Sequence, residues 1–99
     1  MIRITAVVAL FRDLPEAELT TWIARGWVRP ERDYEGDFVF AEIDVARVRL
    51  VHDFRRELAI EEETMPVVLS LIDQIHDLRR ALRAARSSPL PLWEEPGEG

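Results

Sequence analysis

The sequence predicts a mainly helical fold, in which a small helix-turn-helix unit with a two-stranded wing precedes a long C-terminal helix that dimerises. Three observations predict it. An apolar-faced helical stretch ends at Gly26, a residue suited to stop a helix. Two short β-prone stretches then flank a polar loop. Near the C-terminus, apolar residues recur at alternating spacings of three and four, which is typical of a coiled-coil seam.

The first element is an apolar run from residue 4 to residue 11, whose periodicity fits either a strand or a helix. Its length and its position before a turn favour a short helix that begins near Thr5, a suitable N-cap. Residues 13–15 form the turn. Proline is accepted at the start of a helix, so the chain can re-enter a helix directly at Pro15.

The second predicted helix runs from Pro15 to Gly26. Glu16 and Glu18 lie in its first turn, where the helix dipole favours acidic side chains. Its apolar stripe consists of residues at spacings of three and four: Leu19, Trp22 and Ile23. Gly26 then ends the helix as the residue after the C-cap.

The wing follows as strands over residues 27–29 and 38–40, with the polar loop 30–37 between them. Residues 42–58 have helical periodicity again. The apolar face that this periodicity predicts consists of five residues: Ile43, Ala46, Leu50, Phe54 and Leu58. Residues 59–63 are expected to break this helix.

The long helix spans about residues 62–86, with regular helix expected from near Thr64 because Pro66 is tolerated only in a first turn. Its seam, and hence the predicted dimer interface, is formed by Val68, Leu71, Ile75, Leu78 and Leu82, with Ala85 continuing the spacing. At ~1.5 Å per residue the helix is roughly 35 Å long. This small domain cannot cover a seam of that length.

Charge along this helix is polarised, because three Glu residues (61–63) precede it and four Arg residues end it. Both groups suit the helix dipole. Parallel pairing of two copies would set like charges together, whereas antiparallel pairing sets each acidic start near a basic end. We therefore expect a homodimer with antiparallel long helices. The alternative is a monomer whose long helix folds back on its own domain.

Three segments are thus expected: a winged helix-turn-helix domain at 1–60, the dimerisation helix at 61–86, and a disordered, acidic, proline-rich tail at 87–99. Within the tail, PLPLW is either a short peptide motif or a segment whose Trp93 lies on the nearest apolar surface. The chain shows no internal repeat.

Composition limits the function. The 99 residues carry a formal charge of −6, no Cys, and 13 cations, all of them Arg. Disulfides and thiolate metal sites are therefore excluded. The N-terminal apolar run is too short for a signal sequence or a membrane span, so we expect a soluble, cytoplasmic protein without membrane contact.

No motif indicates catalysis. The only histidines, His52 and His76, lie on different predicted helices, and the chain has no HExxH, no Gly-rich phosphate loop and no GxSxG. The consecutive acids 61–63 point in different directions on a helix and cannot converge on one ion. We expect no enzyme activity, no cofactor and no metal.

The predicted wing region is acidic, since residues 13–44 hold nine acids against three Arg. Nucleic acid is not the expected partner, because phosphate binding requires basic side chains. A basic protein partner is expected instead. The candidate contacts are the acids Glu16, Glu18, Asp33, Glu35 and Asp37, with Trp27 and Tyr34 as possible aromatic anchors. Trp27 fits a core position equally well.

Several stretches together resemble a known family, the CbpM type of chaperone modulator within the MerR-like proteins. The matching pieces are Arg56-Glu57-Leu58-Ala59, the run VVLSLID at 67–73, and Ile75-His76-Asp77-Leu78. Upstream, three more pieces also fit: Leu14 with residues 16–19, Gly26-Trp27-Val28 with Pro30, and Phe38-Val39-Phe40. The similarity covers roughly residues 3–86 and is distributed over them.

The resemblance implies a MerR-like winged helix-turn-helix fold and a homodimeric adaptor. It implies binding to the J-domain of a DnaJ/CbpA-like co-chaperone, which would block the work of that co-chaperone with the Hsp70 chaperone DnaK. Two alternatives stay open. A MerR-like DNA-binding transcriptional regulator would need one basic surface made of Arg25, Arg29, Arg32, Arg47 and Arg49. A toxin-neutralising or other small adaptor could use the same acidic face.

Overall fold

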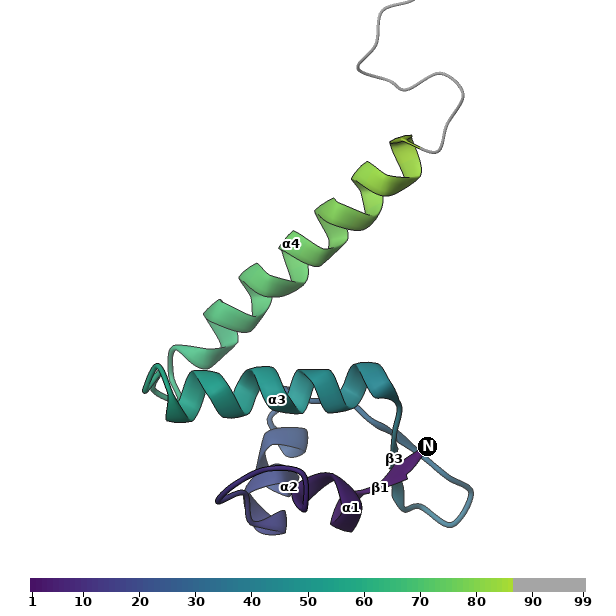
Figure 1. Ribbon diagram of the computed structural model, residues 1–99, viewed down its shortest axis with the longest axis vertical. Helices are drawn as coiled ribbons and strands as arrows, with labels where there is room; N and C mark the ends of the chain where they lie inside the picture. The colour runs from purple at the N-terminus through teal and green to yellow at the C-terminus, as the bar shows by residue number, and fades with distance from the viewer. Residues whose placement is uncertain (87–99) are drawn as a thin grey trace, which may run out of the picture. The chain divides into compact units, whose positions relative to one another are not determined.

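The computed structural model describes residues 1–86, which form a mainly helical structure with one small antiparallel sheet (Figure 1). The chain divides into two compact units, Met1–Met65 and Pro66–Gly99. The first unit contains three helices and all three strands, and the second contains nearly all of the long helix α4. The prediction of a disordered tail and a PLPLW motif concerns residues outside the described ones.

The N-terminus begins with a strand that the sequence did not reveal. Strand β1 (Ile2–Arg3) leads directly into helix α1 (Ile4–Val8), so the predicted short helix is present but starts one residue before Thr5. Strand β1 pairs with the distant β3 strand, with Ile2 opposite Phe40. Two residues are too few to show a period, and only the partner strand distinguishes them from the helix that follows.

Helix α2 (Glu16–Ala24) ends as predicted at Gly26, whose φ is +79°. Two hydrogen bonds close the end: the Gly26 N–H donates to the Ile23 carbonyl at 3.0 Å, and the Trp27 N–H donates to the Trp22 carbonyl at 3.0 Å. This pair of bonds is a Schellman motif, which requires the left-handed conformation that glycine adopts without strain. Trp22 and Leu19 bury their side chains in the core.

The hairpin differs from its predicted position. Strand β2 is Glu31–Arg32 instead of residues 27–29, and it pairs with strand β3 (Phe38–Phe40) in the order β1-β3-β2. The β-prone character of Trp27 and Val28 reflects burial, since they are 4% and 0% exposed. The Trp27 N–H is already used to cap α2, and its carbonyl accepts a 2.8 Å hydrogen bond from Arg47 Nε. These groups therefore cannot join a strand ladder.

Helix α3 (Glu42–Arg56) ends two residues before the predicted Leu58, and its predicted apolar face is wrong in part, since only Leu50 and Phe54 of that face are half-buried. Ile43 and Leu58 are 77% and 64% exposed, whereas Val48 and Val51 are fully buried. The inward stripe also contains polar residues, and each has a defined partner. Asp44 accepts the Ala41 N–H, His52 Nε2 donates to the Arg12 carbonyl, and Arg55 donates to the Ile60 carbonyl.

The reason for the error on α3 is physical. Counting apolar residues favours the face with the most Leu, Ile and Phe, but a polar side chain is accepted on the inward face when its hydrogen bonds are satisfied. The inward stripe of α3 is of this kind. Its partners are backbone groups outside the helix, namely the Ala41 N–H and the carbonyls of Ile60 and Arg12, and the apolar pattern of the helix itself gives no sign of them.

A turn around Ala59, whose φ is +52°, ends α3, and α4 (Met65–Arg86) begins six residues later. The break predicted at 59–63 is thus present, and Pro66 lies in the first turn as expected. Among the described residues, no helix is both long enough and apolar enough to cross a membrane.

Candidate functional site: the acidic hairpin

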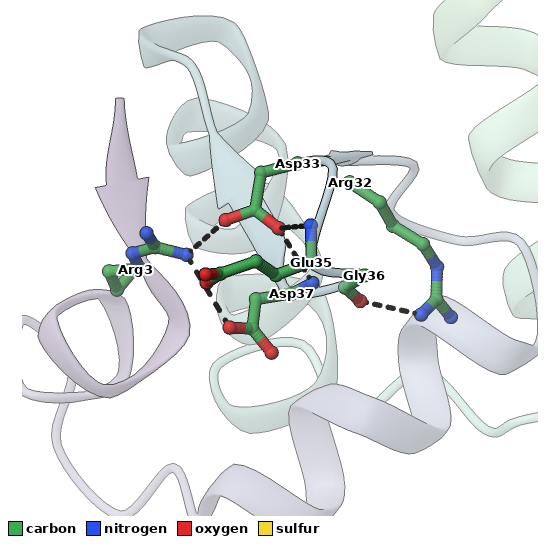
Figure 2. A network of polar contacts seen from close by, with 6 residues as sticks. All are labelled: Arg3, Arg32, Asp33, Glu35, Gly36 and Asp37. Atoms are coloured by element: carbon green, nitrogen blue, oxygen red, sulfur yellow. Dashed lines mark hydrogen bonds and ion pairs between the residues drawn. The ribbon is translucent and has the colours of Figure 1, made fainter.

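The loop from Asp33 to Asp37 joins β2 to β3 and is closed by the Asp33 side chain and main chain (Figure 2). Asp33 Oδ1 accepts hydrogen bonds from the N–H groups of Glu35 at 2.9 Å and Asp37 at 3.0 Å. The Asp33 N–H donates to the Asp37 carbonyl, and the Gly36 N–H donates to the Asp33 carbonyl, both at 2.9 Å. Gly36 has a φ of +90°, a conformation that glycine adopts without strain.

A cation from the N-terminal strand occupies one side of this loop. Arg3 Nη1 donates to Asp33 Oδ2 at 2.6 Å and lies 3.8 Å from Asp37 Oδ2 (Figure 2). The hydrogen bond from Arg3 lowers the pKa of the Asp33 carboxyl below its ordinary value, and the backbone N–H donors act in the same direction. The same bond raises the pKa of Arg3. The Asp33 side chain is only 17% exposed.

The predicted contact residue Asp33 is therefore committed to the loop's own structure. Each of its carboxylate oxygens already accepts hydrogen bonds from within the chain. A partner would have to break those bonds to use it. Sequence reasoning missed Arg3, because nothing in the N-terminal pattern shows that its strand pairs beside the loop.

Three carboxylates of the loop, from Asp33, Glu35 and Asp37, bring one oxygen each to within 4.8 Å of one another. Carboxylate oxygens are the ligands that hard cations such as Ca²⁺ prefer. Here the guanidinium of Arg3 already supplies a positive charge to two of the three. The expectation that the chain uses no metal remains a prediction.

The tip of the loop is the most exposed part of the site. Tyr34 is 98% exposed, the Asp37 side chain is 67% exposed, and Glu35 is exposed as well. Hydrogen bonds fix the backbone of the loop, so these three side chains project from a defined backbone conformation. A preorganised loop loses less conformational entropy on binding than a flexible one.

The other predicted contacts divide between structure and surface. Glu16 is exposed at the start of α2. Glu18 instead accepts two hydrogen bonds from Arg56, at 2.8 and 3.1 Å, and Arg56 also donates to the Asp13 carbonyl at 2.7 Å. The bond to Glu18 raises the pKa of Arg56. Glu18 thus connects α2 to the end of α3.

Trp27 is a core residue and not an exposed anchor. Its side chain is 4% exposed, and its ring centroid lies 6.5 Å from that of Trp22. The guanidinium of Arg25 lies over the ring at 5.6 Å. The sequence allowed either a core position or a surface contact for Trp27, and the structure shows the core position. Tyr34 is then the candidate for an aromatic contact at the surface.

The five arginines that a DNA-binding surface would need all have partners within the chain. Arg25 lies 3.6 Å from Glu62, and Arg29 Nε donates to the Gly26 carbonyl at 3.3 Å. Arg32 donates to the Gly36 carbonyl and lies over the Phe38 ring. The last two arginines lie on α3. Arg47 donates a hydrogen bond to the Trp27 carbonyl, and the guanidinium of Arg49 lies 5.0 Å from the Phe11 ring centroid.

The predicted interface residues of α4 are exposed along most of the seam. Leu71, Ile75, Leu78 and Leu82 are between 42% and 69% exposed, while Val68 is half-buried. Large aliphatic side chains at this spacing leave a continuous apolar stripe in water. The stripe needs a cover that the described part of the chain does not provide.

Comparison with known proteins identifies no relative: no family model, no curated protein and no solved structure matches this chain.

Proposed function

We propose that this chain is a non-enzymatic chaperone modulator of the CbpM type with a MerR-like winged helix-turn-helix fold. It binds the J-domain of a DnaJ/CbpA-like co-chaperone and inhibits the work of that co-chaperone with the Hsp70 chaperone DnaK. It acts in the cytoplasm as a homodimer whose long helices pair antiparallel. The resemblance in sequence and the acidic hairpin support this proposal.

The observation that carries the proposal is the preorganised acidic hairpin with an exposed aromatic tip. Tyr34, Glu35 and Asp37 project from a loop whose backbone is closed by the Asp33 carboxylate. Glu16 adds an exposed acid at the start of α2. These four residues form the proposed contact set, whereas Asp33 closes the loop, Glu18 joins α2 to α3 and Trp27 lies in the core.

Electrostatics suits this partner. The family resemblance implies a J-domain with a basic helix, and acidic side chains on this chain would attract it. Complementary charge raises the association rate and selects against acidic competitors. An exposed tyrosine supplies apolar area and a cation–π surface for an arginine or lysine of the partner. Blocking the basic helix in this way would keep it from DnaK.

The main alternative, DNA binding, has less support. Binding to duplex DNA requires several cations free to meet phosphates. The five arginines named above each have an intramolecular partner, and Arg47 is in part buried with its guanidinium on the Trp27 carbonyl. Meanwhile the exposed hairpin acids would repel a phosphate backbone.

The test compares binding of the full chain to an isolated J-domain and to a promoter duplex by calorimetry over a range of salt concentrations. Micromolar or tighter binding to the J-domain that weakens with salt is expected, together with no binding to the duplex. Tight duplex binding with a steep salt slope would overturn the proposal.

A matched pair of variants locates the surface. The triple variant Glu16→Gln, Glu35→Gln, Asp37→Asn removes three negative charges from the proposed contact set and should weaken J-domain binding at least tenfold. The control variant Glu57→Gln, Glu61→Gln, Glu63→Gln removes the same charge from exposed acids elsewhere. Equal losses in both variants would mean that only net charge matters and that the hairpin is the wrong surface.

A further inference from the structure

The apolar stripe on α4 offers one feature beyond a general dimer, namely its register. Its six members lie at positions 68, 71, 75, 78, 82 and 85, so the spacing alternates strictly between three and four residues. In heptad terms Val68, Ile75 and Leu82 occupy one core position, and Leu71, Leu78 and Ala85 occupy the other. All six lie within the helix Met65–Arg86.

The middle four residues of this stripe have no cover among the described residues, whereas Val68 and Ala85 at its ends are half-buried. From Leu71 to Leu82 every seam residue is at least 42% exposed. Isolated exposed aliphatic side chains are ordinary, but four in one line on a helix are not. The covering surface must present a matching line of aliphatic side chains, and a second copy of α4 does so.

Charge decides the direction of the second copy. Segment 79–86 carries four Arg and no acid. A parallel partner helix would place these four arginines beside the same four arginines of the second copy. An antiparallel partner centred on the seam sets them opposite its own segment 67–74, which contains one acid, Asp73, and no cation. Like charges side by side are destabilising, so the antiparallel direction is favoured.

Sequence spacing then decides the register. We infer that two copies of α4 pair antiparallel with Ile75 packed against Leu78 of the partner subunit. Leu71 then packs against Leu82 of the partner subunit, and Val68 against Ala85 of the partner subunit. The inference rests on the homodimer that is part of the proposed function and adds which residues meet.

No neighbouring register pairs the whole seam. A shift by one heptad in one direction places the counterparts of Leu82 and Ala85 before the start of α4 at Met65. The opposite shift places the counterparts of Val68 and Leu71 beyond Arg86. Either shift leaves two of the six seam residues without an apolar counterpart within the helix. Only the inferred register buries all six on each chain.

The natural absence of cysteine makes this register directly measurable by disulfide trapping. Single-cysteine chains Ile75→Cys and Leu78→Cys, one carrying a mass tag, are mixed, allowed to exchange, and oxidised mildly. The mixed disulfide is expected to exceed either self-disulfide at least fivefold, since a disulfide forms only between positions whose Cα atoms lie close together. The pair Leu71→Cys with Leu82→Cys should also give mainly the mixed disulfide. It replaces the first pair if Ile75→Cys or Leu78→Cys disrupts folding.

The control pair is Ser70→Cys with Ala84→Cys, at nearly matching heights along the helices but exposed and outside the seam. It should give little product. Strong self-disulfides of Ile75→Cys would indicate a different register, and strong self-disulfides at both Leu71→Cys and Leu82→Cys would indicate parallel helices; either overturns the inference. The inference is also overturned if light scattering gives the mass of a single chain and no mixture forms a disulfide.

The trapping experiment tests the register independently of the proposed function, because it uses this chain alone and no J-domain. A trapped dimer of the inferred register that ignores the J-domain would refute only the chaperone role. J-domain binding by a chain that fails to trap would refute only the register.

Discussion

Asp33 shows at the scale of one residue how an acidic side chain can be structural inside an acidic loop. Its Oδ1 accepts two backbone N–H groups and its Oδ2 accepts Arg3. Glu35 and Asp37 carry the same kind of charged group in the same loop, yet they remain exposed. Counting charges therefore overestimates how many carboxylates such a loop offers to a partner.

The lowered pKa of Asp33 predicts a pH dependence of stability. A carboxyl whose pKa is lower in the folded state stabilises the fold above its unfolded pKa, near 3.8, and this contribution is lost as pH falls through the folded value. Asp33→Asn keeps an oxygen that can accept the backbone bonds but loses the charge. It should unfold at lower urea concentration near neutral pH and converge with the parent chain below the folded pKa.

Urea titrations followed by circular dichroism at several pH values measure this difference. The Arg3→Gln variant and the double variant complete the cycle, and the coupling between the two substitutions should also vanish in acid. A difference between the parent chain and Asp33→Asn that stays constant at all pH values would contradict the prediction.

At the scale of elements, the end of α2 and the inward face of α3 illustrate two kinds of sequence signal. Gly26 is a local signal, because the left-handed conformation is needed by the residue itself. The face of α3 is not local. Val48 and Val51 are buried on the same helix as Asp44 and His52, whose partners are backbone groups outside the helix, the Ala41 N–H and the Arg12 carbonyl.

The end of α2 predicts the cost of replacing its glycine. A Cβ at position 26 would meet no atom within 4 Å, so Gly26→Ala carries only the conformational cost of φ +79°. We expect a loss of about 1–2 kcal/mol in the free energy of unfolding, measured by urea titration. Gly26→Asn should lose less, because asparagine tolerates this conformation better. Equal stability of the parent chain and Gly26→Ala would contradict this account.

The face of α3 predicts a contrast between two truncations on one helix. Val48→Ala removes two buried methyl groups and should cost about 2 kcal/mol. Ile43→Ala removes more carbon from a side chain that is 77% exposed, and should change stability by less than about 0.5 kcal/mol. The reverse order would show that the face first predicted from the sequence is the buried one after all.

At the scale of the whole chain, the two features that support the proposed function lie in different compact units. The acidic hairpin belongs to Met1–Met65, and the exposed seam belongs to the unit that begins at Pro66. In the proposed dimer, the second unit would join two copies while each first unit presents one hairpin. Two hairpins per dimer would allow two J-domains, or one bivalent partner, to bind.

A dimer joined through α4 predicts stability that depends on concentration. The midpoint of thermal unfolding should rise by a few degrees for each tenfold increase in protein concentration, measured by circular dichroism. Leu78→Gln, within the seam, should lower the midpoint and remove this dependence. His76→Gln, exposed and outside the seam, should behave like the parent chain. A midpoint independent of concentration in the parent chain would argue for a monomer.

Four features could be predicted from the residue types: the helical class, the stop of α2 at Gly26, the break after α3 and the extent of α4. These features follow from interactions between residues a few positions apart. Over such short stretches, the residue types reveal both the preferred backbone conformation and the helical period. Among the candidate contacts, the exposed positions of Glu16, Tyr34, Glu35 and Asp37 also agree with the sequence prediction.

The remaining features are seen only in the folded structure. It placed β1 beside β3, moved β2 to Glu31–Arg32, turned Val48 inward, and used Asp33 and Trp27 within the fold. Asp33 and the Trp27 carbonyl depend on partners far away in the chain, Arg3 and Arg47, and β1 likewise pairs with the distant strand β3. Whether a polar group is buried and paired is settled by those distant neighbours, and no local pattern encodes them.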